Sequence, residues 1–108
     1  MFLSRDTTIA EAKLTQYLLV PLIKDDKSKF PAKADYTLDN WQQLEQDLRS
    51  QVLTKPAELV ETNRYGSKYS IRALLRGGNG VEIDILTIWM VSGDTTSFVT
   101  LVPDKGVN

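Results

Sequence analysis

The chain has 108 residues, no cysteine and no histidine, and its formal net charge is −1. This length fits one domain with a single core, so we expect one α+β domain over residues 1–108. Without cysteine there can be no disulfide or thiolate metal site, and without histidine the commonest general base and metal ligand are missing. The near-zero charge gives no overall attraction to nucleic acids or anionic membranes.

No targeting segment or membrane span is visible in the sequence. The first residues lack the long apolar region of a signal peptide. The longest apolar run, from Tyr17 to Ile23, is interrupted by Pro21 and is too short to cross a bilayer. We therefore expect a cytoplasmic protein with no membrane partner.

Two helices are predicted in the first half of the chain. The first begins at Thr8, which forms a capping-box pattern with Glu11, and it carries apolar residues at helical spacing up to Leu22. The second begins near Asp39, where the capping-box pattern ends at Gln42. The apolar stripe of this second helix consists of Trp41, Leu44, Leu48 and Val52.

The segment between the helices, residues 24–36, is rich in both lysine and aspartate. A mixed charge run of this kind is typical of a solvated loop, and an anion-binding loop is the alternative. Asp25 and Asp26 are adjacent carboxylates, but no partners stand at the spacing that a metal ion requires. We predict no metal site and no cofactor.

Four strands are predicted in the second half, over residues 58–62, 68–75, 81–91 and 97–102. The third is the longest run of β-branched and aromatic residues, and glycine-containing turns flank it. We expect it to be the central strand. The expected fold is thus α+β, with two N-terminal helices followed by a four-stranded antiparallel β-meander.

The glycine-rich turn between the second and third strands predicts their register. Pairing Leu75 with Val81 leaves one face of the hairpin apolar throughout, and we expect this face to meet the helices. On the other face, the same register pairs Arg72 with Asp84, and opposite charges at such positions stabilise a sheet. The outer face is therefore charged at one end.

The other end of the outer face is expected to be apolar. Pairing Val91 with Ser97 in the last hairpin places Trp89 opposite Val99 on the core face. The outer face then carries five apolar residues, which are Leu86, Ile88, Met90, Phe98 and Val102. So many apolar side chains are unusual on a solvated face. Either a helix of the chain or a partner covers them, and the sequence leaves both possibilities open.

The stretch from Tyr65 to Tyr69 is the most suggestive cluster of reactive side chains. Lys68 and Arg72 could stabilise negative charge developing at a phosphate diester, and Tyr65 could transfer a proton. The alternative is an ordinary turn between strands with Lys68 in water. These three residues are the candidate catalytic set.

A series of short motifs runs along nearly the whole chain, and it includes Lys13-Leu-Thr-Gln-Tyr17, Asp26-Lys-Ser-Lys-Phe30, Asn40-Trp41, Tyr65-Gly-Ser-Lys-Tyr69 and Thr87-Ile-Trp-Met90. Their order resembles an uncharacterised family of small bacterial domains of unknown function. Some relatives occur in contexts similar to toxin systems, and their layout resembles that of compact ribonucleases without histidine. The resemblance implies a set of positions to examine, with Asp26 and Lys27 as binding candidates besides Lys13, Tyr65, Lys68 and Trp89.

Two main functions are expected from these observations. The first is a protein-interaction module that forms a homodimer, or docks a small protein partner, through the outer face of its sheet. The alternative is a metal-independent ribonuclease or toxin-like enzyme that acts on RNA through Tyr65, Lys68 and Arg72. A small-molecule site between the second helix and the sheet is a third possibility, without a specific motif to support it.

Overall fold

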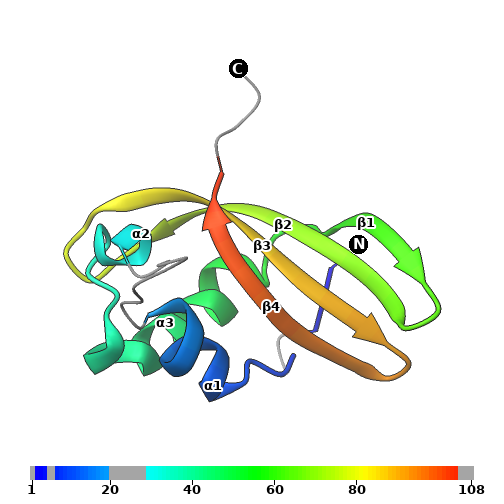
Figure 1. The fold of residues 1–108 in the computed structure, drawn as a ribbon. Helices are drawn as coiled ribbons and strands as arrows, with labels where there is room; N and C mark the ends of the chain where they lie inside the picture. Colours follow the sequence, from blue (N-terminus) through cyan, green and yellow to red (C-terminus); the bar gives the residue numbers. More distant parts are fainter. Residues whose placement is uncertain (1, 5–6, 20–28, 105–108) are drawn as a thin grey trace.

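Four antiparallel strands form the sheet in the order β1-β2-β3-β4, and their bounds are Glu58–Asn63, Gly66–Arg76, Glu82–Ser92 and Thr95–Pro103. The computed structural model describes residues 2–4, 7–19 and 29–104. Within this part, the helical segments gather on one face of the sheet (Figure 1). The fold is therefore α+β, and the predicted β-meander is confirmed.

The helical half consists of short segments, and it is less regular than two continuous α-helices. The segments are α1 (Glu11–Lys13), η1 (Leu14–Leu18), α2 (Lys29–Ala32), η2 (Leu38–Asn40), α3 (Trp41–Asp47) and η3 (Leu48–Val52). In η1 and η3 the turns widen to π-helical geometry, where the amide of Leu19 bonds the carbonyl oxygen of Leu14 at 2.9 Å.

Both predicted helix starts differ from the observed ones. Thr8 does not cap a helix, because its backbone is extended and bonds β4, and α1 begins at Glu11. The longer helical stretch begins at Leu38, one residue early. There the side-chain oxygen of Asn40 accepts a hydrogen bond from the amide of Thr37 at 2.7 Å, which satisfies an orphan donor at this end.

The core lies between the helical layer and the inner face of the sheet. The predicted stripe of the second helix is confirmed, since Leu44, Leu48 and Val52 are fully buried and Trp41 packs against them. From the sheet, the buried residues of β2 and β3 alternate along each strand, as one buried face requires, and they include Ile71, Leu75, Ile83, Ile85, Thr87 and Trp89.

The β2–β3 hairpin keeps the predicted faces but not the predicted partners. Leu75 lies opposite Ile83, and Arg72 lies opposite Leu86, so the expected pair of Arg72 with Asp84 is wrong. The cause is the turn, which spans residues 77–81 because the amide of Gly77 bonds the carbonyl oxygen of Val81 at 3.0 Å. A shift of two residues changes partners without exchanging the two faces.

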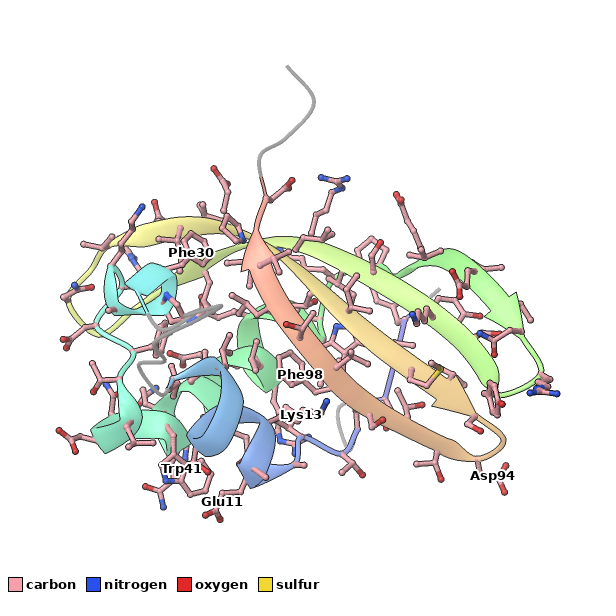
Figure 2. All side chains as sticks on the ribbon, viewed as in Figure 1. Glu11, Lys13, Phe30, Trp41, Asp94 and Phe98 are labelled. Carbon is pink, nitrogen blue, oxygen red and sulfur yellow. The ribbon has the colours of Figure 1, made fainter. Side chains whose placement is uncertain are left out.

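The β3–β4 hairpin contains a bulge that the sequence did not reveal. The register shifts between Ile88, which faces Thr100, and Trp89, which faces Phe98. The extra residue in β4 is Val99. Residues 95–98 of β4 therefore present the opposite faces from those in the predicted pairing. Phe98 consequently points toward the helices and is 2 % exposed (Figure 2), and its predicted place on the outer face is wrong.

Candidate functional site

The outer face of the sheet is the surface that holds most of the predicted binding residues. Leu86, Ile88 and Met90 of β3 alternate with more buried residues, and Val102 of β4 lies opposite Leu86, so all four point away from the helical layer. Their neighbours in the sheet bury them in part, while Leu74 of β2 is 48 % exposed. No helix in the described ranges lies over this face (Figure 1).

Charged residues of both signs surround this apolar area. Strand β2 contributes three cations to the outer face, which are Lys68, Arg72 and Arg76. Strands β1 and β3 flank it with carboxylates, and these are Glu58, Glu61, Glu82 and Asp84. The Arg72 guanidinium is bound to the Asp104 carboxylate at 2.5 Å, which ties the strand end after β4 to β2.

A small hollow opens on the outer face between β1 and β2. It is lined by Pro56, Glu58, Ser70 and Arg72. The hollow combines a carboxylate, a hydroxyl and a guanidinium, but the guanidinium already has Asp104 as its partner. The hollow is therefore a polar site beside the apolar area that β3 and β4 form.

The candidate catalytic residues are spread along β2 rather than gathered. Tyr65 lies in the turn before β2, is 66 % exposed, and accepts a hydrogen bond from Arg64 at 2.7 Å. Lys68 and Arg72 share the outer face but are four residues apart along an extended strand, or about 13 Å. The described structure therefore holds the backbones of the two cations apart, with Tyr65 in the turn before them.

The other positions implied by the resemblance have varied environments. Asp26 and Lys27 fall outside the described residues. Lys13 is exposed on α1. Trp89 is fully buried, and its indole N–H donates to the hydroxyl of Thr87 at 2.7 Å, so it is a core residue.

Sequence reasoning missed the exposure of β1. All six of its residues are exposed, and Leu59 and Val60 are 59 % and 55 % exposed. The register shifts between Leu59 and Glu61, so Val60 is the extra residue of a bulge. Two adjacent apolar residues in a short strand break the alternation of a half-buried strand, and this was the available signal.

A polar network lies at the end of β2 near Arg76, at the other end of this strand from Tyr65. The hydroxyl of the buried Tyr36 bonds the Asp47 carboxylate and lies 3.0 Å from the carbonyl oxygen of Arg76. Gln51 bonds both the amide and the carbonyl oxygen of Arg76, at 2.8 Å and 3.0 Å. Burial raises the pKa of Tyr36 far above its ordinary value, and the bond to Asp47 adds to the shift.

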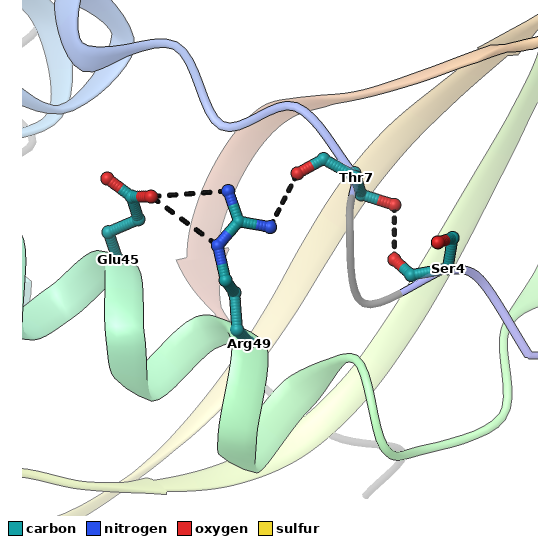
Figure 3. A network of polar contacts seen from close by, with 4 residues as sticks. All are labelled: Ser4, Thr7, Glu45 and Arg49. Atoms are coloured by element: carbon teal, nitrogen blue, oxygen red, sulfur yellow. Dashed lines mark hydrogen bonds and ion pairs between the residues drawn. The ribbon is translucent and has the colours of Figure 1, made fainter.

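The segment before α1 is held against the fold by Arg49 (Figure 3). The guanidinium of Arg49 donates to the carbonyl oxygen of Thr7 at 2.6 Å and pairs with the Glu45 carboxylate at 3.2 Å. The hydroxyl of Thr7 in turn donates to the carbonyl oxygen of Ser4 at 2.5 Å. This arrangement leads Thr8 onto the edge of β4.

The comparisons with known proteins point to one family. Neither the curated proteins nor the solved structures contained a match to the chain. In the described residues no helix is long and apolar enough to cross a membrane, and no group of three acidic side chains there could hold a metal ion. One family model matches residues 4–105, which is nearly the whole chain. The chain therefore belongs to the family described as Domain of unknown function (DUF6883).

Proposed function

We propose that the protein is a self-associating interaction module in which two copies pack through the outer faces of their sheets. The observation that carries this proposal is the placement of the helices, all of which lie on the inner face in the described residues (Figure 1). Leu74, Leu86, Ile88, Met90 and Val102 are thus left without a covering layer. A sheet with apolar residues on both faces needs a second layer on each.

The size of the face supports a second copy as the occupant. Four strands of 6 to 11 residues at ordinary spacings cover about 19 Å by, on average, about 31 Å, on the order of 600 Å². Standard protein interfaces bury roughly 600–1,000 Å² on each partner. One outer face is therefore large enough for a symmetric contact with another.

The distribution of charge also favours a copy of the same chain. A two-fold interface brings the same surface together from both partners, so it must be complementary to itself. If the axis runs parallel to the strands, β2 of each copy lies over β3 of the other copy. The cations of β2, such as Arg76, then approach the carboxylates of β3, such as Glu82. Two sheets stacked this way keep their strands within about 30° of each other.

Sedimentation velocity over a range of concentrations tests this proposal with two variants of equal charge. Ile88→Glu places a carboxylate in the centre of the outer face, and Gln46→Glu places one on the exposed side of α3. We expect the wild type and Gln46→Glu to dimerise and Ile88→Glu to remain a monomer with an unchanged fold. Wild-type protein that stays monomeric up to millimolar concentration contradicts the proposal.

The alternative function, a metal-independent ribonuclease, draws less support from the geometry because Lys68 and Arg72 are four residues apart along an extended strand. It remains a separate prediction with its own assay, in which the purified protein is incubated with total RNA and a chelator. Cleavage that persists with chelator and is lost in Lys68→Ala would establish the activity. Intact RNA in the presence of folded protein would exclude it.

The cytoplasmic location and the toxin-like context also remain predictions. The interaction proposal is compatible with both, because a dimer of this kind needs neither a membrane nor a cofactor. Fractionation of cells that express the protein from its own locus tests the location. Recovery in the cytoplasmic fraction is the expected result, and recovery outside it would overturn this part of the proposal.

A further inference from the structure

Strand β1 is an edge of the sheet, and no other described segment covers its outer side. The order β1-β2-β3-β4 gives it one neighbour, and in the described sheet no strand pairs with its other side. All six of its residues are exposed, whereas β2, β3 and β4 each bury residues. The backbone N–H and C=O groups on the side of β1 away from β2 can therefore hydrogen-bond an added strand.

The opposite edge of the sheet, formed by β4, is partly covered. There the segment before α1 covers part of β4, since the amide of Thr8 bonds the carbonyl oxygen of Thr96 at 2.9 Å and the amide of Phe98 bonds that of Thr8 at 2.8 Å. Arg49 holds this segment in place through Thr7. Among the described residues, the chain thus supplies a partner for the β4 edge and none for the β1 edge.

The bulge at Val60 places both carboxylates of β1 on one face of the sheet and Leu59 on the other. Glu58 faces Ser70 and Glu61 faces Lys68, so both carboxylates lie on the outer face although they are three residues apart. Leu59 faces Tyr69 and therefore points to the other side. An added strand next to β1 would meet carboxylates on one face and an apolar side chain on the other.

This distribution argues against a second copy at the β1 edge. Two β1 strands side by side would bring four carboxylates together without any cation from either strand. Like charges on adjoining strands destabilise their pairing. The outer face carries both signs of charge, but the β1 edge carries only one, so it requires a different partner.

We propose that the β1 edge binds an extended segment of a partner protein in which lysine or arginine alternates with β-branched apolar residues. The segment adds a fifth strand by main-chain hydrogen bonds. Its cations meet Glu58 and Glu61 on the outer face, and its apolar side chains meet Leu59 on the inner face. This site lies at the β1 margin of the outer face, beside the apolar area of β3 and β4, and its charge-based recognition does not rest on self-association.

A titration followed by amide chemical shifts tests the proposal on the full chain. The probes are two capped eight-residue peptides, one alternating lysine with valine and one alternating glutamate with valine. We expect the lysine peptide to shift the amides of residues 58–63 in a saturable way and to bind at least tenfold more tightly than the glutamate peptide. Equal binding of the two peptides, or shifts that avoid β1, would overturn the proposal.

Two variants complete the experiment. The double variant Glu58→Lys with Glu61→Lys changes only exposed residues, and we expect it to reverse the preference in favour of the glutamate peptide. Ile88→Glu should bind the lysine peptide as the wild type does, because its substitution lies on β3. An unchanged preference in the double variant would refute the charge-based recognition, whatever the oligomeric state of the protein.

Discussion

Trp89 and Phe98 lie edge to face across the β3–β4 hairpin, with their ring centroids 5.2 Å apart and their planes at 66°. Both rings are buried, and the Trp89 indole is fixed by its bond to Thr87. The hydroxyl of Thr87 itself donates to the carbonyl oxygen of Ile71 at 3.1 Å. The aromatic pair is therefore anchored to β2, and the bulge at Val99 is what allows it to form.

Truncation of Phe98 should be far more costly than truncation of its neighbour Val99. We expect Phe98→Ala to lower the free energy of unfolding by about 3–5 kcal/mol because it leaves a cavity beside Trp89. Val99→Ala, at the partly buried bulge position, should lower it by less than about 1.5 kcal/mol. Urea denaturation of both variants measures this. A larger loss for Val99→Ala would indicate the register without a bulge.

Removal of the Thr100 hydroxyl should stabilise the protein. Thr100 faces Ile88, and its hydroxyl oxygen is buried without a hydrogen-bond partner among the described residues. Thr100→Val keeps the shape and removes the desolvated group, so we expect the free energy of unfolding to rise by about 1 kcal/mol. Thermal denaturation detects this as a higher Tm. A lower Tm would mean that the hydroxyl contributes a bond.

The Tyr36 hydroxyl should make stability dependent on pH in the alkaline range. Its pKa is raised in the folded state, mainly by burial, so the folded chain keeps a proton that the unfolded chain releases near pH 10. The contribution of this hydroxyl to the free energy of unfolding is fully present below about pH 10, and it decreases as the pH rises above that value. Tyr36→Phe should cost about 1–3 kcal/mol near neutral pH.

The difference between wild type and Tyr36→Phe should therefore narrow as the pH rises. Both chains contain the same lysines and the same other tyrosines, so the variant cancels their titration. Urea denaturation at about pH 8 and about pH 11 measures the two differences. A difference that stays constant over this range would show that Tyr36 keeps its ordinary pKa.

Arg49 should control whether the segment before α1 stays on the edge of β4. Arg49→Met keeps much of the side chain but loses the bond to the Thr7 carbonyl oxygen. We expect faster hydrogen exchange at the Phe98 amide, which bonds the carbonyl oxygen of Thr8. Glu45→Gln is the control, since it removes the ion pair with Arg49, whose two side chains are 32 % and 30 % exposed, and leaves the bond to Thr7. Equal exchange rates in both variants would contradict this role of Arg49.

The sheet was predictable from the sequence because its signals are local and regular. Strand β2 alternates polar and apolar residues from Lys68 to Ala73, and the β-branched and aromatic run of β3 marks it as the central strand. The stripe of Leu44, Leu48 and Val52 follows equally from helical spacing. The turn after Arg76 was placed one residue too early, because several glycines follow Arg76 and each of them allows the chain to reverse.

The bulge at Val99 could not be derived from pattern alone, and the bulge at Val60 had only the adjacent apolar pair in β1 as its signal. Each inserts one residue, and the choice between bulged and regular pairing depends on contacts with residues that are distant in the sequence. For β4 the decisive contact is between Phe98 and Trp89, which belong to different strands. The start of α1 has a similar cause, because the bonds of Thr8 to β4 replace the local capping pattern.

Paramagnetic relaxation between two copies would test the face-to-face dimer most directly. The chain has no cysteine, so Thr95→Cys provides a unique site for a spin label at the rim of the outer face. Mixing this labelled protein with isotope-labelled wild type should broaden the amides of Leu86, Ile88 and Met90, while a label at Gln46→Cys on α3 should leave them sharp. Broadening that spares β3, or equal effects from both labels, would contradict the proposed interface.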